Sequence, residues 1–154
     1  MSSREADAIN IRPQPEELTR ASRTSPAENV ADEVGFIRRD GVLCCDDVSL
    51  ETIAAEIGTP VYVYSALAIR SQYEVLNRAL AKVPHRLHYS VKANSNLAIL
   101  GVIRRLGAGV DIVSGGEMYR AQSAGFTGRD IVFSGVGKTE RELTEALTLG
   151  VLLI

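Results

Sequence analysis

The segment His88–Asn96, HYSVKANSN, places a lysine at the end of a short apolar stretch, directly before residues that favour the start of a helix. Alternate side chains of a strand share a face, so His88, Ser90 and Lys92 point to one side. The other side carries residues that can pack under helices: Leu87, Tyr89 and Val91. A lysine at the carboxyl end of a buried strand is partly removed from water, which favours its neutral amine. Such an amine attacks carbonyl carbons and forms Schiff bases, whereas a surface lysine only reaches solvent.

Two carboxylates follow that lysine at spacings that suit either chemistry or local structure. Asp111 stands near the end of the next apolar run, where it either contributes to a site or pairs with a basic residue. Ser114 and Glu117 match a capping box, in which the glutamate binds backbone donors at a helix start, and a site role for Glu117 is compatible with it. His88 is either a site residue or a hydrogen-bonded core histidine. The segment Thr139–Glu142 has the same capping pattern, and there we favour the cap alone.

The elements that must position these residues repeat as one unit from residue 61 onward. Each unit is an apolar strand followed by a capped amphipathic helix, and the strand ends near Lys92, Ser114 and Ser134 recur about every 20 residues. We predict strands at residues 61–64, 87–91, 110–113, 131–133 and 151–154. We predict helices from residue 66 up to Pro84 and over 95–106, 115–124 and 140–149. The predicted fold class is therefore α/β, a partial (β/α)8 TIM-type barrel with parallel strands and helices outside.

The chain divides into three predicted parts. Residues 1–32 hold three prolines among charged and small polar residues without an apolar period, which predicts a disordered tail. Residues 33–60 predict a hairpin that turns at Asp40-Gly41 and a short helix that ends at Gly58. Residues 61–154 predict an incomplete barrel, because the sequence stops inside an apolar strand after too few units to close a barrel of eight. We therefore expect a longer protein, with a complete small open sheet as the alternative.

Composition excludes several classes of function. The net charge of −2 offers no basic field for nucleic acid or an anionic membrane surface. The sequence has neither an apolar run of the roughly 18 residues that a membrane span requires nor a signal-peptide pattern at its start. Cys44 and Cys45 are adjacent, so they provide no disulfide framework and no metal-ligand spacing. We expect a small-molecule site, no metal, and a cytoplasmic location.

Two nucleotide-binding motifs are only partly present. The segment Ser134–Thr139, SGVGKT, matches the end of a phosphate-binding P-loop, but the glycine required five positions before Gly137 is Val132. The segment GAG at residues 107–109 lacks the third glycine of a dinucleotide fingerprint, because residue 112 is Ile. We therefore predict neither a nucleotide hydrolase nor a dinucleotide-binding enzyme.

Three motifs resemble one family when they are taken together. They are HYSVKANSNLAIL at residues 88–100, GAGVDIVSGGE at 107–117 and IVFSGVGKT at 131–139. In this order and at these separations, they resemble the N-terminal barrel segment of the diaminopimelate decarboxylases, which are fold-type III pyridoxal-phosphate enzymes. The resemblance runs from about Gly35 to the last residue. The short motifs KANSN, VSGGE and FSGVGKT favour this subfamily over the racemases of the same fold type.

The resemblance implies a function and a set of site residues. Lys92 is implied to carry pyridoxal 5'-phosphate covalently, with Asp111 and Glu117 beside the cofactor and His88 as a candidate contact under it. The implied reaction removes CO2 from the D-configured centre of meso-2,6-diaminopimelate and gives L-lysine, a step of lysine biosynthesis. A homodimer with shared active sites is implied as well, and residues 33–60 are assigned to a β domain. The family's phosphate loop and substrate-binding residues come from later in its chains, so we expect these 154 residues to be inactive alone.

Two alternatives stay open at this point. Another basic amino-acid decarboxylase of the same fold type would show the same motifs, because these residues do not define the substrate. A protein of a different class would keep the half-barrel as a binding or regulatory module and would never use Lys92.

Overall fold

A computed structural model of the chain describes residues 35–154, which begin with a short antiparallel sheet. Strand β1 (Phe36–Arg39) pairs with β2 (Val42–Cys45), and β3 (Val48–Ser49) pairs with the other edge of β2. Asp40 and Gly41 both have positive φ angles, of 51° and 83°, as a tight two-residue hairpin turn requires. The predicted hairpin is confirmed. Its assignment to a separate β domain stays a prediction, and the predicted tail lies outside the described residues.

Helices α1 (Leu50–Ile57) and α2 (Ala66–Ala79) follow the hairpin, and each begins at a serine cap. Ser49 accepts hydrogen bonds from two backbone N–H groups of α1, and Ser65 Oγ accepts one from Ala68 N at 2.9 Å. Ser65 also donates to Asp46, whose carboxylate accepts from the first N–H of α2 at 3.1 Å. Helix α2 ends at Ala79, earlier than the predicted end at Pro84.

Residues 61–64, predicted as the first strand of the repeat, belong to no strand. A strand forms only where backbone groups pair with a neighbouring strand. In the described part of the chain the parallel sheet contains only the strands that follow α2, and none of them pairs with residues 61–64. Tyr62 is 89% exposed, so its side chain is not held in the core either. The prediction of a strand at residues 61–64 was therefore wrong.

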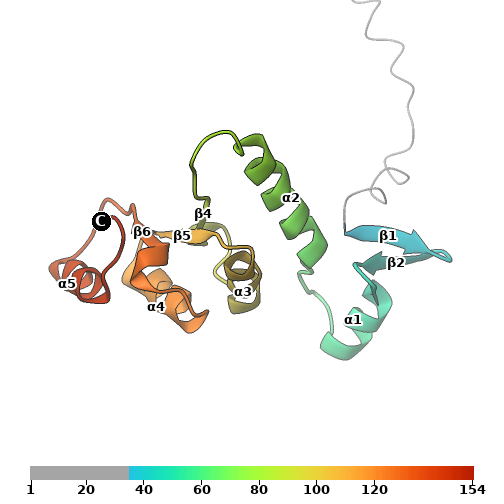
Figure 1. Ribbon diagram of the computed structural model, residues 1–154. Helices are drawn as coiled ribbons and strands as arrows, with labels where there is room; N and C mark the ends of the chain where they lie inside the picture. Colours follow the sequence, from blue (N-terminus) through green and yellow to red (C-terminus); the bar gives the residue numbers. More distant parts are fainter. Residues whose placement is uncertain (1–34) are drawn as a thin grey trace, which may run out of the picture. The chain divides into compact units, whose positions relative to one another are not determined.

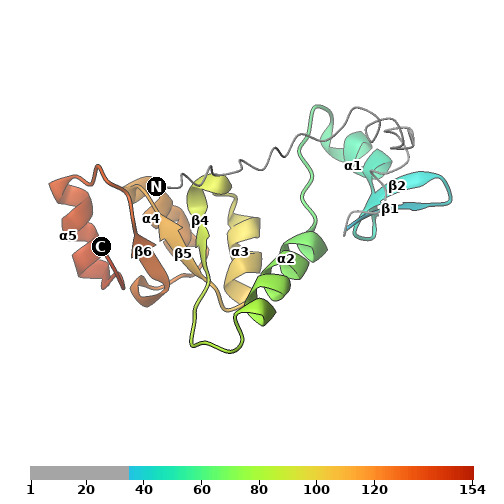
Figure 2. The same cartoon turned by 90° about the horizontal axis from the view of Figure 1, so that it is seen from above.

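The parallel sheet consists of β4 (His88–Ser90), β5 (Gly109–Ile112) and β6 (Ile131–Phe133), in that order, as Figure 2 shows. Ser90 pairs with Asp111, and Asp111 pairs with Val132. Beyond β6, the predicted last strand is reduced to an isolated parallel bridge between Val132 and Leu153. These three strands match the predicted ones to within two residues at each end.

Three helices cover one face of this sheet: α3 (Leu97–Arg105), α4 (Gly115–Ser123) and α5 (Glu140–Leu149) (Figure 1). This outer face carries the fully buried side chains of the strands, which are Val110, Ile112, Ile131 and Phe133. They pack with apolar helix residues in one cluster: Leu100, Ile103, Met118, Ala121 and Ala146. The inner face carries the alternate residues, which are only half-buried: His88, Ser90, Asp111 and Val132.

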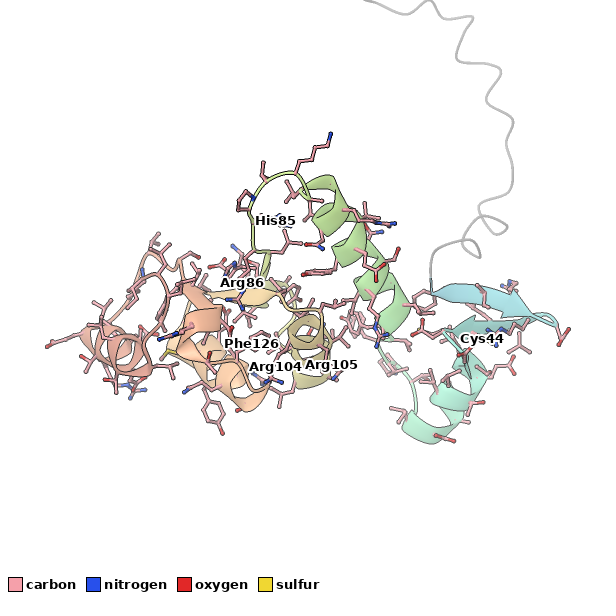
Figure 3. All side chains as sticks on the ribbon, viewed as in Figure 1. Cys44, His85, Arg86, Arg104, Arg105 and Phe126 are labelled. Carbon is pink, nitrogen blue, oxygen red and sulfur yellow. The ribbon has the colours of Figure 1, made fainter. Side chains whose placement is uncertain are left out.

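The amino ends of β4 and β6 are tied by an ion pair. Arg86 precedes β4, as Figure 3 shows, and its guanidinium donates to the Asp130 carboxylate and, at 3.1 Å, to the Arg129 carbonyl. Asp130 also accepts from the backbone N–H and the hydroxyl of Thr127, at 2.8 and 2.7 Å. These bonds, led by that of Arg86, lower the pKa of Asp130 to about 2. None of the helices within residues 35–154 is both long and apolar enough to cross a membrane.

Candidate active site

Lys92 lies in a single 3-10 turn, Val91–Ala93, that begins where β4 ends. Val91 is fully buried and anchors this turn in the core, whereas Lys92 is exposed. The lysine is therefore at the carboxyl end of its strand, as predicted, but the partial removal from water that we expected is not found. Helices α3, α4 and α5 pack on the outer face of the parallel sheet and leave its carboxyl end at Lys92, here called the Lys92 edge, open to solvent.

The turn that carries Lys92 is held by the side chains around it. Tyr89 donates from its hydroxyl to the Asn94 carbonyl at 3.2 Å; burial raises the pKa of this phenol, against the opposite effect of that hydrogen bond. Asn94 Oδ1 accepts from Asn96 N at 3.0 Å, and Asn96 Oδ1 accepts from Ala98 N at 2.8 Å, which caps α3. The asparagines of KANSN thus end the turn and start the helix, which explains why a lysine can stand between a strand and a helix.

Asp111 lies on the inner face of β5, opposite Ser90 of β4. Ser90 Oγ donates to Asp111 Oδ2 at 3.0 Å. The other carboxylate oxygen, Oδ1, is shielded from solvent and has no partner among the described residues. The alternative in which Asp111 pairs with a basic residue receives no support from the described contacts. This partnership of Ser90 was not predicted from the sequence, although the separation of 21 positions matches the period of the repeat.

Glu117 takes part in the start of α4. Its backbone N–H donates to the N-cap Ser114 Oγ at 3.3 Å, and its carboxylate accepts from Val113 N at 2.9 Å. The capping interpretation of Glu117 is confirmed in this form, with the glutamate reaching one residue further back than in a standard capping box. Contact of Glu117 with a cofactor stays a prediction, because capping uses one carboxylate oxygen and leaves the site role compatible with it.

A third carboxylate, which the sequence analysis treated only as a cap, links two helix starts. Glu142 accepts from the N–H and hydroxyl of Thr139 at 2.9 and 2.8 Å, as predicted, and also from Gly115 N at 2.7 Å. These hydrogen bonds, with that from the Thr139 backbone contributing most, lower the pKa of Glu142 to about 2. A side chain at Gly115 would stand 3.2 Å from Glu142 Cγ, so a glycine suits this approach. No local pattern signals the contact with Gly115.

His88 lies two residues before Ser90 on the inner face, roughly 7 Å further from the Lys92 edge at about 3.3 Å per residue. Its ring covers Gly109, where an added Cβ would come within 2.4 Å of it. Its Nδ1 is 3.4 Å from the Arg86 carbonyl, and its Nε2 is buried without a partner in the described part of the chain. The packing favours the core interpretation, and the partnerless nitrogen keeps the site interpretation open.

The residues present fit a pyridoxal cofactor in two respects. An exposed primary amine at the carboxyl edge of a parallel strand suits covalent attachment of an aldehyde. The inner face of the sheet carries two buried polar atoms without a partner among residues 35–154, Asp111 Oδ1 and His88 Nε2. Such atoms suit hydrogen bonding to a polar ring system.

Comparison with known proteins identifies the family. Residues 67–154 match the model of the pyridoxal-dependent decarboxylases, specifically their pyridoxal binding domain. The chain belongs to the pyridoxal-dependent decarboxylase family. Pyridoxal phosphate is therefore the cofactor of its family, and the resemblance and the cofactor inferred from the sequence motifs are confirmed.

Individual decarboxylases of this family are similar to the chain over most of its length. The diaminopimelate decarboxylase of Pseudomonas fluorescens is 51% identical over 116 residues, which are 75% of this chain and 28% of the relative. That of Vibrio cholerae is 45% identical over 73% of the chain and 27% of the relative. The crystal structure of the M. jannaschii enzyme in complex with L-lysine has a TM-score of 0.70 at 31% identity, covering 79% of this chain and 30% of that one.

These similarities show the fold class and how much of a relative's length the chain covers. The match to solved decarboxylases confirms the predicted class, a parallel α/β arrangement of the partial-barrel type preceded by a hairpin. The chain spans less than a third of the length of the curated relatives it matches.

Proposed function

We propose that this chain is the cofactor-attachment segment of a diaminopimelate decarboxylase, acting on meso-2,6-diaminopimelate to release CO2 and L-lysine. The observation that carries the proposal is the position of Lys92, on a turn anchored by Val91 at the carboxyl end of β4 with Asp111 on the neighbouring strand. Identity of 51% to a decarboxylase of that name supports the choice of substrate.

The described contacts suggest tasks for Lys92, Asp111 and Ser90. Pyridoxal phosphate, when bound, supplies an electron sink that accepts the electron pair left behind by departing CO2. Lys92 binds the cofactor through Nζ and can carry a proton at that atom. Asp111 presents its Oδ1 as an acceptor on the inner face, and Ser90 fixes the orientation of its carboxylate. Two further residues complete the proposed set: Glu117, in the first turn of α4, and His88, two residues before Ser90 in β4.

The assembly and the location of the protein are further parts of this proposal. We infer a homodimer with shared active sites from the family resemblance. We infer a cytoplasmic location from the same resemblance and from the two free, buried thiols of Cys44 and Cys45. Sedimentation equilibrium of the protein and fractionation of cells that express it measure the two properties. A monomer at high concentration would contradict the first inference, and recovery outside the cytoplasm would contradict the second.

Selective labelling tests the proposed role of Lys92. The sequence contains three lysines, Lys82, Lys92 and Lys138, so each can be followed in one digest. Incubation with pyridoxal phosphate, reduction with borohydride and peptide mapping should place the label on Lys92 ahead of the other two. Lys92→Ala should abolish the visible absorbance of the bound cofactor, whereas Lys82→Ala, the matched control, should retain it. Equal labelling of all three lysines would favour the non-catalytic module instead.

A chimera tests the activity and the substrate. The remainder of the Pseudomonas fluorescens relative, joined after Ile154, should give a protein that releases CO2 from meso-diaminopimelate, and the 154 residues alone should release none. The same chimera with Lys92→Ala should be inactive. Preference for ornithine or lysine over diaminopimelate would contradict the substrate assignment and favour another basic amino-acid decarboxylase.

A further inference from the structure

Ser90 and Asp111 form a polar pair across β4 and β5, on the inner face of the sheet. They are in register, and Ser90 Oγ donates to Asp111 Oδ2 at 3.0 Å. The other in-register neighbour of Asp111 is Val132 of β6, whose side chain has no hydrogen-bonding group. Ser90 is therefore the neighbouring side chain that can fix the rotation of the Asp111 carboxylate.

The hydrogen bond leaves Asp111 with one oxygen held and one oxygen without a partner. Oδ1 is shielded from solvent and accepts no hydrogen bond from the described residues. The bond to Ser90 fixes the direction in which Oδ1 points. A carboxylate released from such a bond can turn toward a nearby donor, and an ammonium group is a strong one. Lys92 leaves β4 two residues after Ser90, in the turn that continues the strand.

We propose that Ser90 is a positioning residue that holds the Asp111 carboxylate on the β4–β5 pair and thereby keeps the Lys92 amine reactive. The inference rests on the proposed function in taking Lys92 as the reactive amine. Without the Ser90 hydroxyl, the carboxylate is free to rotate and to pair with the Lys92 ammonium. A paired ammonium holds its proton more firmly and is not a nucleophile.

The reactivity of the three lysines tests the proposal without any cofactor. The chain is exposed to a limiting amount of acetic anhydride at pH 8, and the acetylation of Lys82, Lys92 and Lys138 is quantified by mass spectrometry. Ser90→Ala should lower the rate at Lys92, relative to the other two lysines, by about two- to fivefold, the effect of one partly exposed ion pair. Ser90→Thr, which keeps the hydroxyl, should restore the rate.

A double-mutant cycle shows whether Ser90 acts through Asp111. Asp111→Asn removes the charge, so Lys92 should react at least as fast as in the unmodified chain. In the Asp111→Asn background, the addition of Ser90→Ala should then have no further effect. Val132→Ala is the matched control, because it removes the other in-register neighbour of Asp111 and should leave the relative rate at Lys92 unchanged.

The outcomes separate this inference from the proposed function. An unchanged rate in Ser90→Ala, the same loss in Ser90→Thr, or a loss that persists with Asp111→Asn would each overturn the role of Ser90. Failure of pyridoxal phosphate to label Lys92, with the acetylation pattern as expected, would overturn the proposed function alone. Circular dichroism checks that each variant is folded, and Ser90→Cys, a weak donor of similar size, replaces Ser90→Ala should the latter unfold.

Discussion

The two faces of the parallel sheet differ in what their residues do, although the residues alternate along the same strands. On the outer face, Val110, Ile112 and Ile131 are 0% exposed and pack under the helices. On the inner face, Ser90 and Asp111 are half-buried and hydrogen-bonded to each other, with one carboxylate oxygen left without a partner in the described region. Alternation thus lets one short strand stabilise the fold with one residue and serve the candidate site with the next.

Substitutions of neighbouring residues in β6 give the largest expected contrast between the faces. Phe133 is 1% exposed on the outer face. Phe133→Ala should lower the free energy of unfolding by about 3–5 kcal/mol, because the substitution leaves an unfilled cavity. Val132→Ala, on the half-buried inner face, should cost only about 1 kcal/mol. Urea unfolding followed by circular dichroism measures both. Equal losses would show that the inner face is as much a part of the core as the outer one.

The amino end of the inner face is expected to be tightly packed, unlike the Lys92 edge. A Cβ at Gly109 would stand 2.4 Å from the His88 ring and 2.6 Å from the Asp130 carbonyl oxygen. Gly109→Ala should therefore cost about 1–3 kcal/mol through overpacking. Gly137→Ala is the control, because a Cβ there meets no atom within 4 Å. A Gly109→Ala variant as stable as the unmodified chain would mean that the His88 ring moves aside freely.

The Arg86–Asp130 pair joins the amino ends of β4 and β6 and should make the stability of the protein sensitive to acid. The pKa of Asp130 is lowered from 3.8 to about 2, so the stabilisation is complete above about pH 4 and is lost as the pH falls toward 2. Because both side chains are partly exposed, the loss should be about 1 kcal/mol. Stability curves at pH 2 to 6 test this. Asp130→Asn should flatten that part of the curve, and the same acid sensitivity in Asp130→Asn would assign it to other carboxylates.

The contact between Glu142 and Gly115, at the carboxyl end of the parallel sheet, should have the smallest and most local effect on stability when it is removed. Glu142→Ala removes the acceptor of Gly115 N, so the amide hydrogen of Gly115 should exchange faster while unfolding changes little. Glu145→Ala is the control on the same helix, since its carboxylate bonds only Arg141, at 3.1 Å, among the contacts described. Unchanged exchange at Gly115 in Glu142→Ala would show that Glu142 does not hold the β5–α4 turn.

Much of the fold follows from local sequence patterns. The hairpin turn at Asp40-Gly41, the cap Ser114 and the capping box at Thr139 are all where the sequence predicts them. These features depend on residues within one helical turn or one hairpin, so the sequence contains all that defines them. The strand expected at residues 61–64 failed because strand formation depends on a distant partner.

The candidate site divides in the same way. The sequence by itself determined which residue types follow each strand, and with them the position of Lys92 at the end of β4, the capping role of Glu117 and the family. Only the tertiary structure decided that Ser90 binds Asp111, that Tyr89 holds the Lys92 turn, that Glu142 reaches Gly115 and that Lys92 is exposed. The physical reason is that caps and turns are set by neighbours along the chain. Contacts across strands and exposure to water depend on register and on which face the helices cover.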